Sequence, residues 1–591
     1  MRIKDALANI HKEHADDALN ELYTVWGEKL DKESVWQEYP RPQMQREQYQ
    51  MLHGEWDYAI VSKDDEKPFE SQGKILVPFS PEAPLSGVKR QLKPNEYLWY
   101  QRELSIEPQE GKRCVLHFDA VDQQAVVYIG DTEMARHYGG YLPFEIDITE
   151  FVSEKPCVLR VRVEDESDTS YHTRGKQTLK RGGMFYTAQS GIWQSVWYEW
   201  VPENYVKCYR VTPDYDSASV KMEFTSKKEF QSVSLEMKDA EVIFEVQKEK
   251  REDEFLTTIL LQFPNSEFKS WSPEEPFLYE FTIKADEDSF QSYFAMRSFT
   301  IEKDENGTPR FCLNHKPYFL NGVLDQGYWP DGLLTAPCDE AFVYDIELVK
   351  KLGFNMIRKH IKIEPLRWYY HCDRLGMIVW QDMVNGGTKY NMPFVCYLPT
   401  GLPFVGKIVK DNLYSMFSRK SKEGRDLWEE ECKGTIEHLY NVPSISTWVP
   451  FNEAWGQFDA VRIAREVKAQ DPTRTVDHAS GWFDQKEGDF RSVHNYFRKL
   501  KVEKDKSRAF VISEYGGYAC HMKGHSSVDR IFGYKKYETT EELSKAFREL
   551  IEKDIYGLVD AGLSGAVYTQ LSDVEEEVNG LVTYDRKIVK M

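Results

Sequence analysis

The pattern of apolar residues changes near Phe311, and this change constrains the fold more than any other feature of the sequence. Before it, short runs of alternating apolar and polar residues are separated by Gly, Pro and Asp, which is typical of antiparallel β-sandwiches. After it, short apolar runs alternate with helical segments such as 339–352 and 541–561. Repeated alternation of strand and helix predicts a (β/α)8 TIM barrel as the C-terminal domain.

Eight short apolar runs after Phe311 are the predicted barrel strands, because a barrel of this type is built from eight parallel strands. The runs comprise residues 318–323, 355–358, 377–382, 445–450, 475–478, 492–496, 510–514 and 565–570. The stretch 385–430 is rich in Gly, Pro and aromatic residues. We expect it to form a loop or small subdomain beside the functional site.

The chain has 591 residues, which is too many for a single hydrophobic core. We therefore expect a multidomain protein with four segments. These are a charged, partly helical lead-in (1–45) packed on another domain, a jelly-roll β-sandwich (46–202), an immunoglobulin-like β-sandwich (203–302) and the TIM barrel (303–591).

The formal net charge of −21 argues against a nucleic-acid partner, because binding DNA or RNA needs a basic surface. The nine cysteines are scattered without a CxxC pair, which indicates reduced thiols and no zinc site. The N-terminus lacks the apolar run of a signal peptide, and no apolar run is long enough to span a membrane. The sequence therefore predicts a cytoplasmic protein with neither nucleic acid nor a membrane as a partner.

Two of the predicted strands lead directly into a glutamate. The run 447–452 ends at Glu453, and the run 510–513 ends at Glu514. The carboxyl ends of barrel strands meet at one rim, and two carboxylates facing each other there are the basic equipment of glycoside hydrolysis. Either glutamate alone could equally be a solvated loop residue, but the pair favours an enzyme.

Other polar residues follow the predicted strands at the same rim, where we expect them to bind substrate. They are Asp325, Arg358, His360, Asp382, Asn452, His494, Tyr496 and Gln570. Trp455 and Trp482 are candidate sugar-stacking platforms, with a place in the core as the equally weighted alternative. His478 lies at the same rim, and we expect it to be structural.

Chemical roles follow from the neighbours of each residue. Glu453 lies between Phe451 and Trp455, so partial desolvation favours its protonated form and a role as general acid/base. Glu514 is the predicted nucleophile, oriented by Tyr496. Asn452 is suited to hydrogen-bond the sugar 2-hydroxyl.

Three further features suggest alternatives at this rim. Lys359 and Lys362 could bind an acidic sugar, although we expect them to face solvent. The acidic run 573–577 is expected to be a solvated loop, where a bound cation stays open as the less favoured alternative. Neither a cofactor nor a catalytic metal site is predicted.

Five motifs resemble glycoside hydrolase family 2. They are Asn452–Glu453, Ser513–Gly516, His494–Tyr496, Gly182–Trp197 and Trp271–Tyr279. The resemblance covers nearly the whole chain. It implies a sugar-binding jelly roll, an immunoglobulin-like domain and a catalytic barrel. It also implies a retaining double displacement on the non-reducing terminal sugar of a small oligosaccharide or glycoside.

The sequence departs from the family pattern in the segments 325–331 and 358–365, and it has no Asn-x-Lys motif near Glu514. Sugar identity therefore stays open: a β-galactoside is favoured by family frequency, with β-glucuronide, β-mannoside, α-L-arabinoside and β-galacturonide as alternatives. A non-catalytic carbohydrate-binding protein and a transglycosylase are the alternative functions, and a homo-oligomer stays open.

Overall fold

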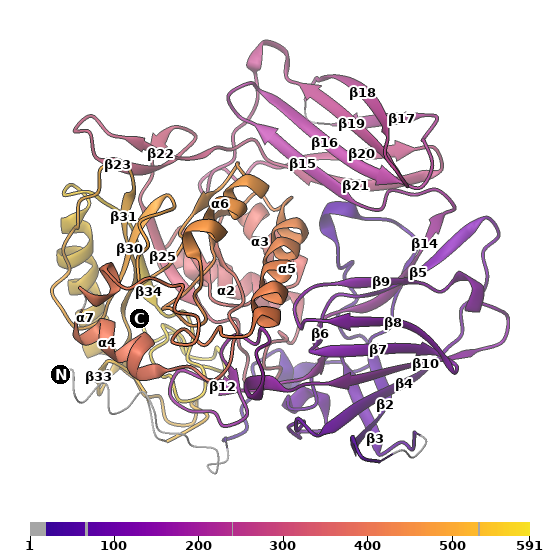
Figure 1. Ribbon diagram of the computed structural model, residues 1–591, viewed down its shortest axis with the longest axis horizontal. Helices are drawn as coiled ribbons and strands as arrows, with labels where there is room; N and C mark the ends of the chain where they lie inside the picture. The colour runs from indigo at the N-terminus through magenta and orange to yellow at the C-terminus, as the bar shows by residue number, and fades with distance from the viewer. Residues whose placement is uncertain (1–18, 66–68, 239, 403, 530–531) are drawn as a thin grey trace.

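The computed structural model describes residues 19–65, 69–238, 240–402, 404–529 and 532–591. Residues 1–18 of the predicted lead-in lie outside these ranges. Figure 1 shows two β-sandwiches at the right and a barrel at the left. The multidomain fold class predicted from the sequence is confirmed.

The first sandwich consists of two antiparallel sheets. One sheet has the strand order β1 (Tyr49–Met51), β14 (Val196–Pro202), β5 (Lys112–Phe118) and β9 (Phe144–Asp147). The other has the order β3 (Gly73–Val77), β2 (Gly54–Ser62), β4 (Glu96–Leu104), β10 (Cys157–Glu164), β7 (Gln124–Ile129) and β8 (Thr132–Tyr138). Along β10, Leu159, Val161 and Val163 are buried and alternate with less buried arginines, as expected for a strand with one face on the core.

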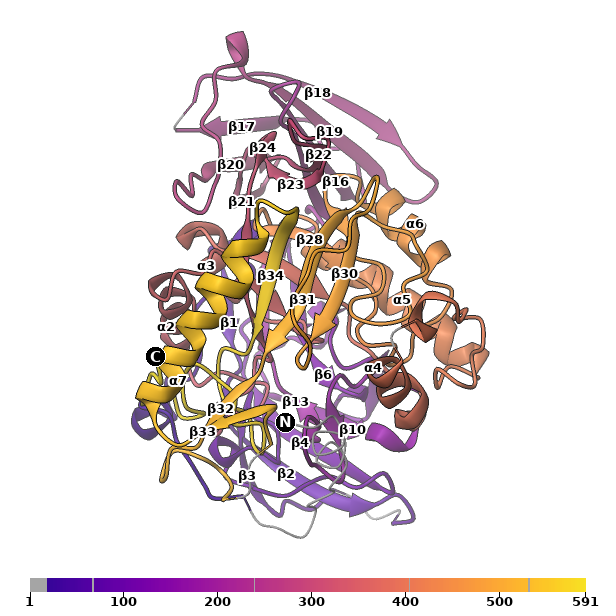
Figure 2. The same cartoon turned by 90° about the vertical axis from the view of Figure 1, so that its left-hand side faces the viewer.

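The second sandwich has a sheet of β15 (Tyr209–Asp214), β16 (Ser219–Ser226), β19 (Phe255–Gln262) and β18 (Ile243–Lys250). It packs against a sheet of β17 (Val233–Met237), β20 (Tyr279–Ala285) and β21 (Asp288–Phe294). Phe224, Ile259 and Phe281 belong to the apolar core of this sandwich. Figure 2 places it at the top of the molecule, above the barrel.

The barrel is one eight-stranded parallel sheet, and all eight predicted strands are present. In chain order they are β25 (Leu320–Asp325), β26 (Met356–Lys359), β27 (Ile378–Asp382), β28 (Ile445–Val449), β29 (Thr475–Val476), β30 (Phe490–Asn495), β31 (Ala509–Gly516) and β34 (Leu563–Thr569). Each strand is hydrogen-bonded to the next barrel strand in this order, except that the ladder is open between β29 and β30. The first strand, β25, also pairs with the last, β34. The side-chain hydrogen bond from Val476 N to Asp489 Oδ2 (2.8 Å) bridges that opening.

Two apolar clusters lie on the two faces of the barrel sheet. Leu320 and Leu324 of β25 belong to the inner cluster, together with Phe311. Phe311 comes from a small sheet of β22 (Phe299–Lys303), β23 (Pro309–Leu313) and β24 (Lys316–Pro317), which closes the N-terminal end of the barrel (Figure 2). Val323 belongs to the outer cluster, beneath the helices.

Helices cover only part of the barrel. The helices that follow strands are α2 (Asp339–Lys351), α3 (Leu366–Leu375), α5 (Lys422–Leu439), α6 (Ala460–Gln470) and α7 (Thr540–Glu549). The predicted helix 541–561 corresponds to α7, which ends at Glu549, and the chain continues as π and 3-10 turns to Leu558. Within the described residues, 477–489, 496–508 and 570–591 contain no helix.

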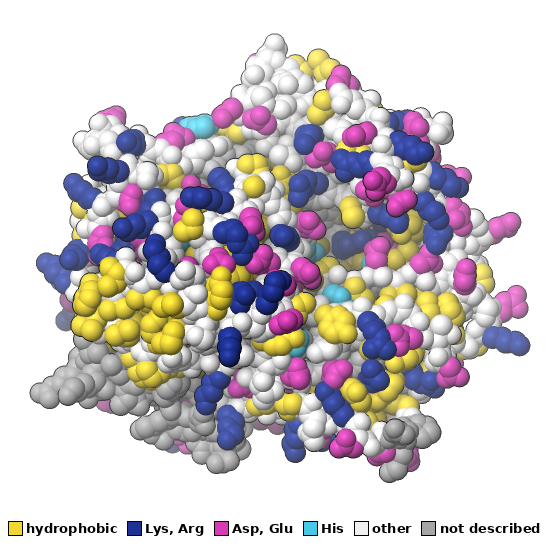
Figure 3. All heavy atoms as spheres, in the orientation of Figure 1, with side chains coloured by type: hydrophobic (Ala, Val, Ile, Leu, Met, Phe, Trp, Pro, Cys, Tyr) yellow, Lys and Arg dark blue, Asp and Glu magenta, His cyan; other side chains and the backbone are white. Residues whose placement is uncertain are grey.

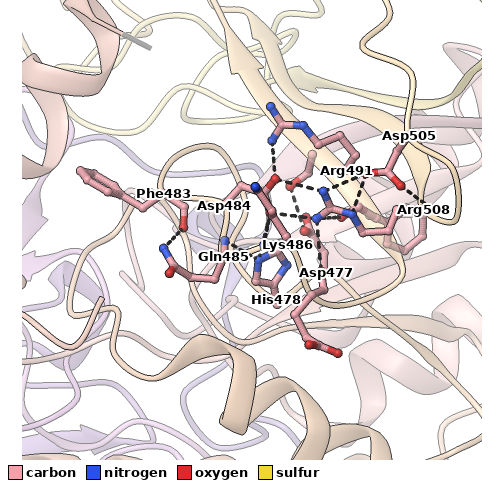
Figure 4. Close-up of polar contacts among 12 residues, drawn as sticks. Asp477, His478, Phe483, Asp484, Gln485, Lys486, Arg491, Asp505 and Arg508 are labelled. Carbon is pink, nitrogen blue, oxygen red and sulfur yellow. Dashed lines mark hydrogen bonds and ion pairs between the residues drawn. The ribbon is translucent and has the colours of Figure 1, made fainter. Parts of the chain in front are cut away.

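Ion pairs hold the loop that follows β29. The Asp484 carboxylate binds Arg508 (2.8 Å) and Arg491 (3.0 Å). His478 Nε2 lies 3.2 Å from Asp484 Oδ1 and accepts a hydrogen bond from Gln485 N. Figure 4 shows these side chains converging on Asp484. These contacts fit the structural role expected for His478.

The described part of the lead-in packs on the barrel. Trp36 Nε1 donates to Ala336 O (2.9 Å), and Thr24 Oγ1 donates to Asp331 Oδ2 (2.7 Å). Trp36 also belongs to the apolar cluster that covers the outer face of the barrel.

The acidic run 573–577 is buried, so the expectation of a solvated loop was wrong. Each carboxylate has a partner: Asp573 binds Lys590 Nζ (2.7 Å), and Glu575 accepts from Thr187 N (3.1 Å). Glu576 pairs with Arg181, and Glu577 accepts from Tyr186. Three of these partners come from the first sandwich, so the run binds the two domains together.

The insertion 385–430 forms a compact body that reaches the cavity described below. It contains a π-helical turn (Pro393–Tyr397), α4 (Leu398–Gly401) and a 3-10 turn (Val405–Lys407), and α5 begins within its last residues. Leu402, Phe404, Ile408 and Leu413 are exposed. Figure 3 shows a hydrophobic area at the left, where Figure 1 draws α4. Among the described residues, no helix is long and apolar enough to cross a membrane.

Candidate active site

Arg358 is the centre of the site. It is fully buried and its guanidinium binds Asp382 through two parallel hydrogen bonds (3.0 and 3.1 Å). The same group donates to Asn452 Oδ1 (2.8 Å) and Glu514 Oε1 (3.3 Å). Because arginine presents its donors in a rigid planar fork, one side chain holds the ends of β27, β28 and β31 in register. His360 Nδ1 completes this group at 2.9 Å from Asp382 Oδ2.

Glu453 lies on a sharp turn after β28. Glu453 (φ +47°) and Ala454 (φ +63°) both have left-handed backbones, which are uncommon for residues other than glycine. The turn is fixed by backbone hydrogen bonds from Glu453 N to Ser480 O (2.9 Å) and from Ser480 N to Phe451 O (2.8 Å). Gly456 follows, where an added Cβ would lie 2.2 Å from Gly386 O. Such backbone strain is found mainly where function requires it.

The two glutamates face each other across His494. One ligand atom each from Glu453, His494 and Glu514 all lie within 4.8 Å of one another. His494 Nδ1 is 2.7 Å from Glu453 Oε1 and 3.4 Å from Glu514 Oε2. His494 Nε2 lies 3.0 Å from Ser480 Oγ and 3.5 Å from Arg358 Nη1, so the ring contacts both glutamates through Nδ1 and the loop after β29 through Nε2.

Glu514 has more donors than Glu453. Its carboxylate accepts from Arg358, and Tyr496 donates its hydroxyl to Oε2. Tyr496 is held in turn by Thr569 Oγ1 (3.0 Å) and by stacking on Tyr534, with ring centroids 3.9 Å apart. These contacts favour the ionised form of Glu514.

Burial raises the pKa of both carboxyls. Desolvation raises the pKa of Glu453 to about 7, against the opposing charges of Lys176 and Arg358. Desolvation also raises the pKa of Glu514, and His494, Arg358 and Tyr496 act to lower it. Because the charged donors gather on Glu514, a single proton shared by the pair resides on Glu453.

Asp325 and Lys359 lie on the outer face of the barrel. Alternate residues of a strand face opposite sides, and Asp325 and Lys359 continue the outward series of Val323 and Ile357. They form an ion pair with each other, and Lys359 also binds Glu364 (2.8 Å). Within the described residues, the Asp325 carboxylate therefore makes no hydrogen bond to the group around Arg358, and Asp325 meets this group only through its backbone oxygen, which accepts from His360 N (2.9 Å).

Lys359 and Lys362 are both buried, so the expectation that they face solvent was wrong. Lys362 Nζ binds Glu364 Oε1 (2.8 Å) and donates to Gly327 O (2.6 Å). Gln570, another predicted site residue, accepts from Gln326 Nε2 (2.7 Å). These residues support the loops around the site.

A cavity of about 510 Å³ opens beside Glu453. Trp482, Glu453, His494 and Tyr496 line it together with residues of the insertion. Trp482 is thus positioned to contact a ligand, with its ring edge-on to His494 (5.5 Å between centroids). Trp455 is buried and stacks on Tyr390, so it belongs to the wall of the site.

Two residues near the glutamates were missed by the sequence reasoning. Lys176 comes from the first sandwich, and its charge lowers the pKa of Glu453. Tyr534 stacks on Tyr496 and lines the cavity. Both lie in loops without a strand-end pattern, so no local signal in the sequence marks them.

Residues 306–589 match the family described as "Glycosyl hydrolases family 2, TIM barrel domain". Residues 84–202 match "Glycosyl hydrolases family 2, sugar binding domain", and residues 204–297 match "Glycosyl hydrolases family 2".

Individual relatives are distant. A β-galactosidase of Thermoanaerobacter pseudethanolicus is 21% identical over 491 residues, covering 79% of this chain and 59% of its own length. A β-glucuronidase of Bacteroides fragilis is 25% identical over 406 residues, covering 64% of this chain and 54% of its own length. A β-D-glucuronidase structure from Dictyoglomus thermophilum superposes with a TM-score of 0.68 at 17% identity, covering 93% of this chain and 97% of that one.

The chain spans just over half the length of the two curated relatives. The three family matches nevertheless follow one another in order and together cover most of the sequence. The structural likeness extends over nearly the whole of both chains. The chain belongs to glycosyl hydrolase family 2.

Proposed function

We propose that the protein is a retaining glycoside hydrolase in which Glu453 is the general acid/base and Glu514 the nucleophile. The observation that carries the proposal is the short separation of the two side chains, with one oxygen of each within 4.8 Å. Retaining enzymes hold their carboxyls about 5–5.5 Å apart, whereas inverting enzymes need about 6.5–9.5 Å to admit a water.

The first step forms a glycosyl ester. The ionised Glu514 attacks the anomeric carbon while the proton of Glu453 moves to the departing oxygen, so the glycosidic bond breaks as the ester bond forms. In the second step Glu453 takes a proton from water, and the water oxygen displaces Glu514. A pKa of about 7 lets Glu453 serve as acid and then as base near neutral pH.

Asn452 is proposed to bind the sugar 2-hydroxyl. Its Oδ1 is occupied by Arg358, which orients the amide. Its Nδ2 is buried and makes no hydrogen bond within the described part of the chain. A buried donor of this kind gains from an acceptor on the substrate, and such contacts strengthen in the transition state.

The substrate is proposed to be a small glycoside that loses its non-reducing terminal sugar, as the family resemblance implies. Both β-galactosidase and β-glucuronidase occur among the names of relatives. Family frequency alone favours a β-galactoside, with a β-glucuronide or β-galacturonide as alternatives. We also propose a reducing compartment such as the cytoplasm, since all nine cysteines lie in the described residues and none forms a disulfide.

Two variants test the assignment on nitrophenyl glycosides. Glu514→Ala should lose turnover and regain it with azide, giving a glycosyl azide of inverted anomeric configuration. Glu453→Ala should retain activity on substrates with good leaving groups and lose it on those with poor ones, because only the latter need protonation. Equal loss on both classes would reject Glu453 as the acid, and an azide product of retained configuration would reject Glu514 as the nucleophile.

A further inference from the structure

Lys176 is a buried lysine without a counter-ion. It belongs to the first sandwich and is 6% exposed. Within the described ranges, its Nζ makes neither a hydrogen bond nor an ion pair. The Nζ lies over the faces of Trp455 and Tyr186, each with its ring centroid 5.6 Å away. Lysine is almost never buried to this extent unless it is paired.

The backbone holds Lys176 rigidly at the barrel mouth. Arg174 N and Gly175 N both donate to Asn385 O (3.0 and 3.1 Å), which ties this loop of the sandwich to the residue that begins the insertion. Gly175 has a left-handed backbone, and an added Cβ would lie 3.0 Å from Ile361 O. On the other side, Tyr186 N donates to Lys176 O (3.0 Å). The lysine is therefore built into the site and is not a mobile surface side chain.

The charge of Lys176 acts on the groups of the active site. It influences the pKa of Glu453, His360 and Asp382. Asp382 and Glu514 both accept hydrogen bonds from Arg358, and burial raises the pKa of Glu453 so that its neutral form is favoured. Within the described residues, none of these three carboxyl groups forms an ion pair with Lys176.

The surroundings of Lys176 offer a further donor. Trp455, whose ring centroid lies 5.6 Å from Lys176 Nζ, has a buried Nε1 that makes no hydrogen bond in the described part of the molecule. A sugar hydroxyl both donates and accepts, whereas a carboxylate only accepts. A cation accompanied by neutral donors is the arrangement that binds a carboxylate most strongly.

We propose that Lys176 selects substrates that carry a carboxylate, so that the enzyme prefers acidic glycosides to their neutral counterparts. The proposal rests on the proposed function, since the substrate is the one cleaved at Glu453 and Glu514. The carboxylate could belong to the sugar, as in a uronide, or to the leaving group. In either case the first sandwich contributes a specificity residue to the site in the barrel.

The test compares matched substrates on wild type, Lys176→Met and Lys176→Arg. The nitrophenyl β-glucuronide and β-galacturonide are each paired with the neutral β-glucoside and β-galactoside, and a third pair adds a carboxylate to the nitrophenyl group of a neutral glycoside. Wild type should favour the acidic member of a pair. Lys176→Met should lose at least about 30-fold in kcat/KM on that member alone, because removing one partner of a buried charge pair usually has an effect of this size. Lys176→Arg should keep part of the preference, and Lys180→Met, an exposed lysine of the same loop, should leave it unchanged.

A pH profile separates substrate recognition from a merely structural role. Glu453 faces Lys176, Arg358, His494, Glu514 and Glu577. Removing the charge of Lys176 should move the alkaline limb of kcat/KM on a neutral glycoside to higher pH.

A preference for the acidic member in the leaving-group pair alone would support the proposal with the aglycone as the source of the carboxylate.

Three outcomes would overturn the proposal. Equal loss on acidic and neutral members in Lys176→Met would show a structural role. Wild-type turnover of neutral glycosides without any acidic preference would reject the inference and leave the proposed function standing. Wild-type inactivity on every substrate would reject both.

Discussion

The burial of Glu453 should make the folded protein lose stability as the pH rises. The pKa of this carboxyl is raised from 4.5 to about 7, chiefly by desolvation. A change of one in pKa corresponds to about 1.36 kcal/mol, so the ionised form is about 3 kcal/mol less favourable in the fold than in the unfolded chain. Between pH 4.5 and about 7 the folded protein keeps a proton that the unfolded chain has lost. The free energy of unfolding therefore falls across this window.

Glu453→Gln removes this dependence, because the amide is neutral throughout. We expect the free energy of unfolding of the variant minus that of wild type to increase by about 3 kcal/mol from pH 4 to pH 8. Urea unfolding followed by tryptophan fluorescence at a series of pH values measures it, and the difference cancels the titration of distant groups. Glu514 is coupled to Glu453, so the change belongs to the proton that the pair shares.

Glu503→Gln provides a control of opposite sign. Burial acts to raise the pKa of Glu503, but hydrogen bonds from Arg491 and Lys407 outweigh it and the pKa is lowered. Glu503 thus stabilises the fold above its unfolded pKa, and its contribution is lost as the pH falls.

One result would refute the assignment of the proton to the buried pair. It is a difference in unfolding free energy between Glu453→Gln and wild type that stays constant within about 1 kcal/mol from pH 4 to pH 8.

Two further predictions concern other parts of the barrel. Gly481 has φ +96°, and an added Cβ would lie 2.8 Å from the His494 ring. Gly481→Ala should therefore displace His494 and lower kcat/KM, with little change in the circular dichroism spectrum. An unchanged kcat/KM would show that the position of His494 is not critical. Lys590→Met leaves the buried Asp573 carboxylate unpaired, which should cost about 3–5 kcal/mol of stability in urea unfolding at neutral pH. Lys587→Met, which breaks an exposed pair with Glu28, should cost no more than about 1 kcal/mol, and equal losses would contradict the buried-charge explanation.

The sequence predicted the fold well because hydrophobic periodicity marks strands and helices directly. All eight barrel strands were identified, since most are short runs buried on both sides, as β31 and β34 are, although β30 has one partly exposed face. The loops that replace helices after β29 and β30 were not predicted. They are held by contacts such as Asp484 with Arg508, whose partners lie 24 residues apart, so local propensity carries no information about them.

Burial of charged residues was the part that sequence reasoning misjudged. Lys359, Lys362 and the run 573–577 look solvated because charged residues usually are. In the fold each is buried against a polar or charged partner, as Glu575 is with Thr187 N and Glu576 with Arg181. A sequence without alignment gives no sign of such contacts, and no local pattern in the sequence marks the burial of Lys176.

The alternation of side chains along β26 decides which residues can contact the sugar. Arg358 points into the barrel and organises Asp382, Asn452 and Glu514, whereas the next residue, Lys359, points outward to Asp325 and Glu364. Among the positions that depart from the family pattern, Asp325, Lys359 and Glu364 therefore belong to the packing network beneath the helices, whereas His360 belongs to the site. The loop around Lys176 faces the glutamates from the other domain, and its unpaired charge makes it the better place to look for specificity.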